Sequence, residues 1–158
     1  MVERAEALAA QFERLSDELT AEIGQRTDEQ WRSSFCKGEG WSIGVTAHHI
    51  AVGISRIAGE VRAMASGQPF PPVTQEQLDK ANEQHARQHG GYTKEETLEL
   101  LRRDVPSAAS LVRALSDEQL RRSATVFAAA PPLTTEQFIQ RLLIGHAVGH
   151  LESMRAAL

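Results

Sequence analysis

Apolar residues recur every three or four positions along four stretches of the chain, which is the spacing that places them on one face of an α-helix. The first stretch runs from Val2 to Ile23, and glutamates and arginines separate its apolar positions. The second begins after Ser42, whose side chain is a suitable N-cap, and we expect it to end near Ser66 and Gly67. The first half of the chain therefore predicts two long amphipathic helices.

The second half contains two further helices of the same kind. Thr93 and Thr134 each stand three residues before a glutamate or a glutamine, which is the spacing of a capping box at a helix N-terminus. The helix after Thr93 should continue to about Leu115, with a kink or a break at Pro106. The helix after Thr134 should run to about Arg155.

The remaining segments are more polar or irregular. A polar helix is predicted from Thr74 to the pair Gly90 and Gly91, and a short helical turn followed by a loop is predicted over residues 116–133. Residues 124–130 are the one doubtful candidate for a strand. The predicted fold is all-α, an antiparallel four-helix bundle with an additional short polar helix, in a single domain over residues 1–158.

Composition and charge restrict the compartment and the partners. The chain is 41% hydrophobic and 24% charged, and no stretch approaches the roughly 20 apolar residues of a membrane span. The net charge is −4, and the basic residues are scattered among acidic ones, so we expect neither nucleic acid nor a membrane as a partner. The first residues do not resemble a secretory signal, which favours the cytoplasm. Cys36, the single cysteine, excludes an internal disulfide and is expected to be a small packing residue, with a role as a resolving or substrate-contacting thiol left open.

Histidines are the candidate functional residues. There are six, arranged as an adjacent pair and two pairs spaced four residues apart: His48 and His49, His85 and His89, His146 and His150. Residues four apart share a helix face, so either spaced pair could supply two ligands to one metal ion. His146 and His150 fall in the apolar sector of the last helix and should point inward, where a buried imidazole needs a partner. His85 and His89 lie among polar residues, so we expect them to be solvated.

A catalytic metal site with three protein ligands needs one more histidine. On the second helix, His49 lies at the edge of the apolar stripe, whereas His48 lies almost opposite, toward solvent. The phase therefore favours His49 and leaves His48 as the alternative. In a second interpretation, all three are core histidines that bond to backbone or hydroxyl groups.

Several short motifs, in their order and spacing, carry a family resemblance. The segments GWSIGVTAHHIA, LDKANEQHARQHGGYTKEE, LSDEQL and GHAVGHLESM resemble the DinB-like superfamily, in particular the branch with mycothiol- and bacillithiol-dependent S-transferases and maleylpyruvate isomerase. The resemblance implies a four-helix bundle, often a homodimer, with a divalent metal held by His49, His146 and His150. Zinc or nickel is expected, although three nitrogen ligands also suit iron, cobalt and copper. Many members are described as metal-dependent hydrolases.

Two reactions at such a site are compatible with the sequence. A divalent ion can hold a thiol as its thiolate or activate a water molecule. No glutamate lies in phase with His146 or His150, and Glu60 is the acid that shares a face with His49, so the general acid or base of a hydrolase is not evident. This favours transfer of a low-molecular-weight thiol, of the mycothiol or bacillithiol type, to an electrophilic small molecule. The alternatives are a metal-dependent hydrolase and a non-catalytic metal-binding or stress protein.

Two residues are candidates for substrate contact. Arg56 lies two turns beyond His49 in similar phase and could receive an anionic group, although a solvated arginine is the simpler interpretation. Asn82 matches the family pattern and could line the pocket, with a surface or helix-packing role as the alternative. Trp31 and Trp41 are expected to anchor the first interhelical segment, and Tyr92 is expected to be a loop residue.

Overall fold

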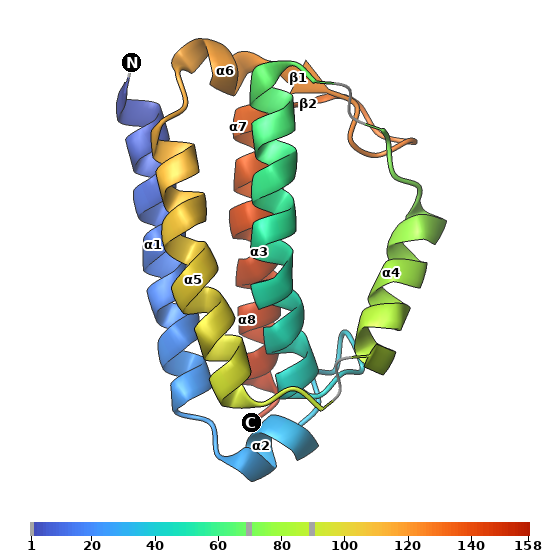
Figure 1. Cartoon of the computed structure of the whole chain (residues 1–158). Coiled ribbons are helices and arrows are strands. Elements are labelled where there is room, and N and C mark those ends of the chain that lie inside the picture. Colours follow the sequence, from blue (N-terminus) through green and yellow to red (C-terminus); the bar gives the residue numbers. More distant parts are fainter. Residues whose placement is uncertain (1, 69–70, 89–90) are drawn as a thin grey trace.

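Four long helical segments run alongside one another in the computed structural model, which describes residues 2–68, 71–88 and 91–158 (Figure 1). Three of them are single helices: α1 (Val2–Gly24), α3 (Ile43–Ser66) and α5 (Lys94–Arg113). The fourth joins α7 (Thr135–Phe138), a π-helical segment η1 (Ile139–Gly145) and α8 (His146–Ala156) end to end. The predicted all-α four-helix bundle is confirmed.

The predicted caps fix where these helices begin. The Ser42 hydroxyl accepts a hydrogen bond from the backbone N–H of Val45 at 3.1 Å, at the start of α3. Thr93 and Thr134 both form complete capping boxes, in which the threonine hydroxyl and the third residue of the helix satisfy each other's backbone N–H groups. At its far end, α3 stops at Gly67, whose φ of 74° is left-handed.

The apolar faces of the four segments meet in one core. Helix α5 packs against α1 and α3, while η1 and α8 also pack against these two helices. Phe12 of α1 and Phe138 of α7 are among the largest fully buried side chains. Pro106 does not break α5, which is continuous through it. Pro106 is exposed, so the helical hydrogen bond that it removes lies on the solvent side, where water can satisfy the freed carbonyl.

Helix α4 (Gln75–Gln88) is the predicted polar helix, and it stands apart from the bundle on the side of α3 (Figure 1). None of its described residues is buried. Its N-terminal end is tied to the loop before α7, because the N–H of Val73 donates to the carbonyl of Val126 at 2.8 Å and the carbonyl of Val73 accepts from the N–H of Ala128 at 3.0 Å. His89 and Gly90, at its predicted end, lie outside the described residues.

The shorter elements differ more from the sequence prediction. Helix α2 (Asp28–Ser33) was not expected, although Thr27 and Gln30 form a capping box there. Helix α6 (Asp117–Arg121) is the expected short turn of helix. A two-stranded antiparallel ladder pairs β1 (Ser123–Ala124) with β2 (Leu133–Thr134), largely outside the doubtful segment 124–130. Within the described parts of the chain, no helix has the length and apolar character needed to cross a membrane.

Candidate metal centre

Three histidines from two helices come together at one side of the bundle. His49 lies on α3, and His146 and His150 lie on the first two turns of α8. One ring nitrogen of each lies within 4.8 Å of the others, and such a group could hold a metal ion. Zinc–imidazole bonds of about 2.0–2.1 Å in a tetrahedral site place ligand nitrogens about 3.3 Å apart. The donor set and its spacing therefore fit a divalent ion after a small closure of the rings.

The rings are oriented toward a common point. The Nε2 atoms of His146 and His150 lie 2.9 Å apart, and their ring planes are nearly perpendicular, at 87°. The ring of His49 faces both edge-on, with centroids 5.3 Å from His146 and 5.0 Å from His150. Whether these residues are metal ligands stays a prediction, but the structure brings together the three that the sequence selected.

The surroundings keep at least two of these imidazoles neutral. Burial, followed by the proximity of His150 and His146, lowers the pKa of His49 to about 3. Burial and the proximity of His150 lower the pKa of His146 to about 4. A histidine can donate a lone pair to a metal only when it is neutral. Near pH 7 these two rings therefore have no proton to release before they bind an ion.

The same shifts predict how the stability of the metal-free protein depends on pH. Because the pKa of His49 is about 3 in the folded state and about 6.5 when unfolded, the unfolded state binds more protons between these values. The free energy of unfolding should therefore fall as the pH falls below about 6.5, with His49 contributing at most about 2 kcal/mol between pH 7 and pH 5. Urea titrations of the chelator-treated protein at both pH values measure this difference. In the variant His49→Gln, the free energy of unfolding should change less between the two pH values. An equal change would contradict the lowered pKa of His49.

Two residues from the turn before α3 contact the histidine cluster. Glu39 Oε1 lies 2.9 Å from Nδ1 of His150, the ring nitrogen that faces away from His146. The Trp41 ring stacks on His150 with a centroid distance of 6.3 Å and meets the edge of His49 at 5.2 Å. Trp31 is buried, as expected of an anchor, but Trp41 lies against the site. Sequence reasoning missed Glu39, because a loop residue carries no periodic signal.

A π-helical turn sets the direction of His146 and His150. Both were predicted to point into the core in phase with Ile139, yet Ile139 is fully buried while His146 is the most exposed of the three histidines. The reason is η1, in which the hydrogen bonds run to the fifth residue and one extra residue is accommodated. One extra residue rotates everything downstream by roughly 100°. The rotation places both imidazoles at the edge of the core, where their rings face His49.

Gly145 has no side chain, and the π-turn depends on this. We therefore expect a side chain at this position to disturb the turn. A Cβ atom at Gly145 would lie 3.0 Å from the carbonyl oxygen of Gln140, so this backbone would have to shift. Gly145→Ala should weaken Co²⁺ binding by about tenfold, because His146 follows directly, while the gain in helix propensity limits the change in stability to about 1 kcal/mol. Gly149→Ala is the matched control, since its Cβ would meet nothing within 4 Å. Equal affinities of both variants and the wild type, measured by Co²⁺ titration, would contradict this role of Gly145.

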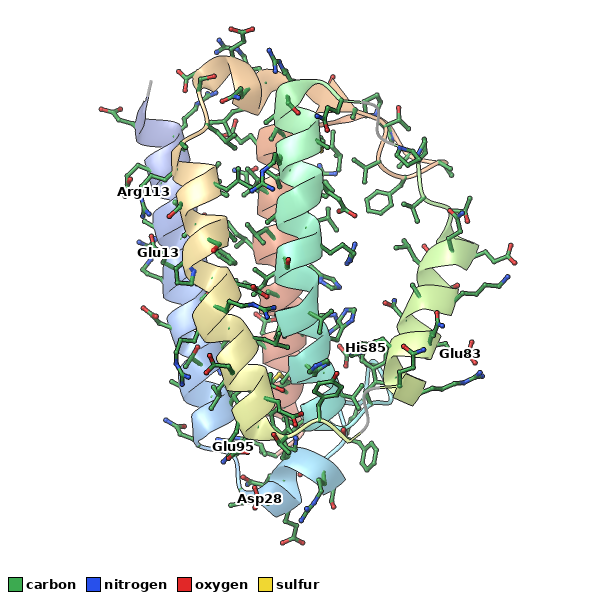
Figure 2. The ribbon with its side chains drawn as sticks, in the orientation of Figure 1. Glu13, Asp28, Glu83, His85, Glu95 and Arg113 are labelled. Carbon is green, nitrogen blue, oxygen red and sulfur yellow. The ribbon has the colours of Figure 1, made fainter. Side chains whose placement is uncertain are left out.

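His48 and His85 were both predicted to face solvent, and both predictions are wrong. The side of α3 that carries His48 is covered, so that His48 is 1% exposed and its Nδ1 lies 3.0 Å from Nε2 of His85. Figure 2 shows His85 on the side of α4 that faces α3, whereas Glu83 points away. The ring of Tyr92, expected to be a simple loop residue, packs on His48 with centroids 3.8 Å apart. His48 thus contacts His85 of α4 and Tyr92 of the loop before α5, and it does not belong to the group formed by His49, His146 and His150.

The histidine cluster borders open space between the bundle and α4. Two adjoining cavities, of about 250 and 370 Å³, are both lined by His49, and the smaller also by His146. Arg56 and Asn82 line both cavities, from α3 and α4 respectively. Glu60 lines the smaller cavity, and its Oε1 lies 3.2 Å from Nη1 of Arg56. Burial raises the pKa of the Glu60 carboxyl, with the neighbouring guanidinium acting in the opposite direction.

Cys36 is the expected small packing residue. It is fully buried, and its sulfur accepts a hydrogen bond from the Thr46 hydroxyl at 3.3 Å. Burial raises the pKa of the Cys36 thiol above its usual value, which disfavours the reactive thiolate.

Comparison with known proteins gives one result that covers nearly the whole chain. The family model of the DinB superfamily matches residues 7–154. No curated protein and no solved structure matches the chain. The matched region contains all three histidines of the cluster and every residue that lines the two cavities.

Proposed function

Since the chain belongs to the DinB superfamily, we propose that it is a metal-dependent transferase that adds a low-molecular-weight thiol to an electrophilic small molecule. The observation that carries the proposal is that His49 and His146 line a cavity. Three histidine ligands leave coordination positions of a divalent ion free, and an ion bound there would favour the thiolate form of a thiol. Zinc or nickel suits the nitrogen ligands, and a thiol of the mycothiol or bacillithiol type is the expected cosubstrate.

The cavity walls supply the contacts that a small molecule needs. Arg56 offers a guanidinium beside His49 and can bind an anionic group of either substrate. Asn82, across the cavity on α4, offers an amide that can donate and accept hydrogen bonds. Phe138 and Leu142 form apolar wall next to His146 and can cover the body of the substrate. The work of these residues is to hold two reactants in line and to exclude water.

The state of the nearby carboxylates favours thiol transfer over hydrolysis. Hydrolysis generally needs a general acid or base close to the attacked atom. Glu39 is engaged by the ring of His150, and Glu60 by the guanidinium of Arg56. A thiol, with an ordinary pKa of about 8.5, needs much less help to lose its proton than water does. Thiol transfer therefore requires no further catalytic group from the protein.

A metal-dependent hydrolase is the second candidate, and it would use Glu60 as its general acid once the contact of this carboxyl with Arg56 is broken. This carboxyl lines the same cavity as His49 and His146, and burial raises its pKa, which suits a general acid. A non-catalytic metal protein would be expected to have a closed site, and the neighbouring cavity favours an enzyme.

Titration of the Co²⁺-substituted protein with thiols tests the proposal. Mycothiol, bacillithiol, glutathione and coenzyme A are added one at a time, and a near-ultraviolet thiolate-to-cobalt band is expected with at least one of them. The variant His49→Ala, treated in the same way, should give no band. Absence of a band with all four thiols, together with metal-dependent hydrolysis of a nitrophenyl ester that Glu60→Gln abolishes, would establish the hydrolase instead.

A further inference from the structure

The turn that precedes α3 holds Glu39 in a fixed place. Within residues 34–42, the backbone N–H of Cys36 donates to the carbonyl of Trp41, and the N–H of Gly40 donates to the carbonyl of Cys36, both at 2.8 Å. Gly40 has a φ of 71°, a left-handed conformation that glycine adopts without strain. The backbone on both sides of Glu39 is therefore tied down, and its carboxylate is directed toward α8.

Glu39 directs its hydrogen bonding to one partner. Its Oε1 lies 2.9 Å from Nδ1 of His150, and the two side chains are 15% and 12% exposed. No donor among the described residues reaches its other oxygen, Oε2, which is also buried. A carboxylate that served to brace the turn would be expected to use both oxygens on the backbone or on basic side chains. The hydrogen bond to His150 therefore indicates that Glu39 acts on this histidine and does not serve to brace the turn.

We propose that Glu39 is a positioning residue for the metal centre, an inference that rests on the proposed metal binding by His150. A neutral imidazole carries a single N–H, so a carboxylate that accepts it at Nδ1 leaves the lone pair at Nε2. Nε2 of His150 is the atom that faces His146, at 2.9 Å. Glu39 therefore fixes both the tautomer and the ring orientation of His150, with its lone pair directed at the place of the ion.

The charge of Glu39 adds to this geometric effect. A negative carboxylate on the far side of the ring makes Nε2 a stronger electron donor. Trp41, from the same turn, lies nearly parallel to one face of the His150 ring, with the ring centroids 6.3 Å apart and an interplanar angle of 19°. One turn thus limits both the rotation and the tautomer of a single ligand.

The first test reads the tautomer in the metal-free wild-type protein. Two-bond ¹H–¹⁵N correlation spectra distinguish a proton on Nδ1 from a proton on Nε2, and His150 is expected to carry it on Nδ1. In the variant Glu39→Ala this preference should be lost. A proton on Nε2 of His150 in the wild type would overturn the inference, whatever the metal affinity of the protein.

The second test measures Co²⁺ affinity in three variants by competition with a chelator. Glu39→Ala should bind Co²⁺ about ten- to a hundredfold more weakly than the wild type, as is typical for the loss of an outer partner of a ligand histidine. Glu39→Gln should recover part of this loss, because its amide oxygen can still accept the Nδ1 proton. Lys37→Ala, an exposed residue of the same turn, should bind like the wild type.

Thermal melting of the metal-free variants separates positioning from folding. A positioning role predicts that Glu39→Gln melts like the wild type while its affinity lies between those of the wild type and Glu39→Ala. Unchanged affinity in Glu39→Ala, or no recovery in Glu39→Gln, would overturn the inference. If the wild type itself binds no Co²⁺, the proposed function fails, and the tautomer measured without metal still decides the role of Glu39.

Discussion

Alanine at position 49 is expected to abolish stoichiometric metal binding. His49 is the ligand candidate that α3 contributes, and one of its ring nitrogens lies within 4.8 Å of those of His146 and His150. Its loss leaves two ligands from one helix. The affinity for the metal ion should therefore fall by more than about 100-fold, which exceeds the typical effect of removing a residue that only hydrogen-bonds to a ligand. The metal content, measured by elemental analysis after metal loading and dialysis, should drop from about one ion per chain to near zero.

His85→Gln is the matched control for this experiment. His85 also lies against His49, with ring centroids 5.3 Å apart, but its Nε2 contacts His48. This variant should retain the ion. Retention of the ion by His49→Ala, or its loss from both variants, would contradict the assignment of ligands.

Alanine at position 44 is expected to destabilise the fold strongly. A Cβ atom there would lie 2.7 Å from Nε1 and 2.8 Å from Cε2 of Trp31, a side chain that is 5% exposed. The Trp31 indole cannot move freely, since its N–H donates to the carbonyl of Tyr92 at 2.9 Å. Overpacking of this kind costs about 1–3 kcal/mol, and each kcal/mol lowers the Tm of a chain of this size by roughly 2–4 °C.

The sign of the change distinguishes this effect from helix propensity. Glycine to alanine in the interior of a helix ordinarily stabilises by about 1 kcal/mol. Gly59→Ala, in the same helix α3, should follow that rule, because its Cβ would meet nothing within 4 Å. The Tm should therefore fall in Gly44→Ala and rise in Gly59→Ala. An increase in Tm for Gly44→Ala would show that Trp31 does not pack on α3 in this way.

Local patterns in the sequence were sufficient for the bundle and for the choice of histidines. Helix periodicity and capping boxes depend on residues three or four apart, so α1, α3, α5 and the last helix could be located closely. The same periodicity selected His49 over His48. It failed for the direction of His146, because the count of 100° per residue does not hold through a π-turn.

Contacts between distant segments could not be predicted in this way. Glu39 and His150 are 111 residues apart in the chain, and no periodic pattern connects a loop to the helix that it contacts. His85 was assigned to solvent because α4 is polar, and α4 indeed has no buried residue among those described. Residues of α4, His85 among them, nevertheless line a cavity opposite residues of α3.

X-ray absorption spectroscopy of the zinc-loaded protein tests most directly whether His49, His146 and His150 hold an ion together. Three imidazole groups are expected, with zinc–nitrogen distances of about 2.0–2.1 Å, accompanied by light atoms and no sulfur. A sulfur neighbour at about 2.3 Å, or fewer than three imidazoles, would contradict the account.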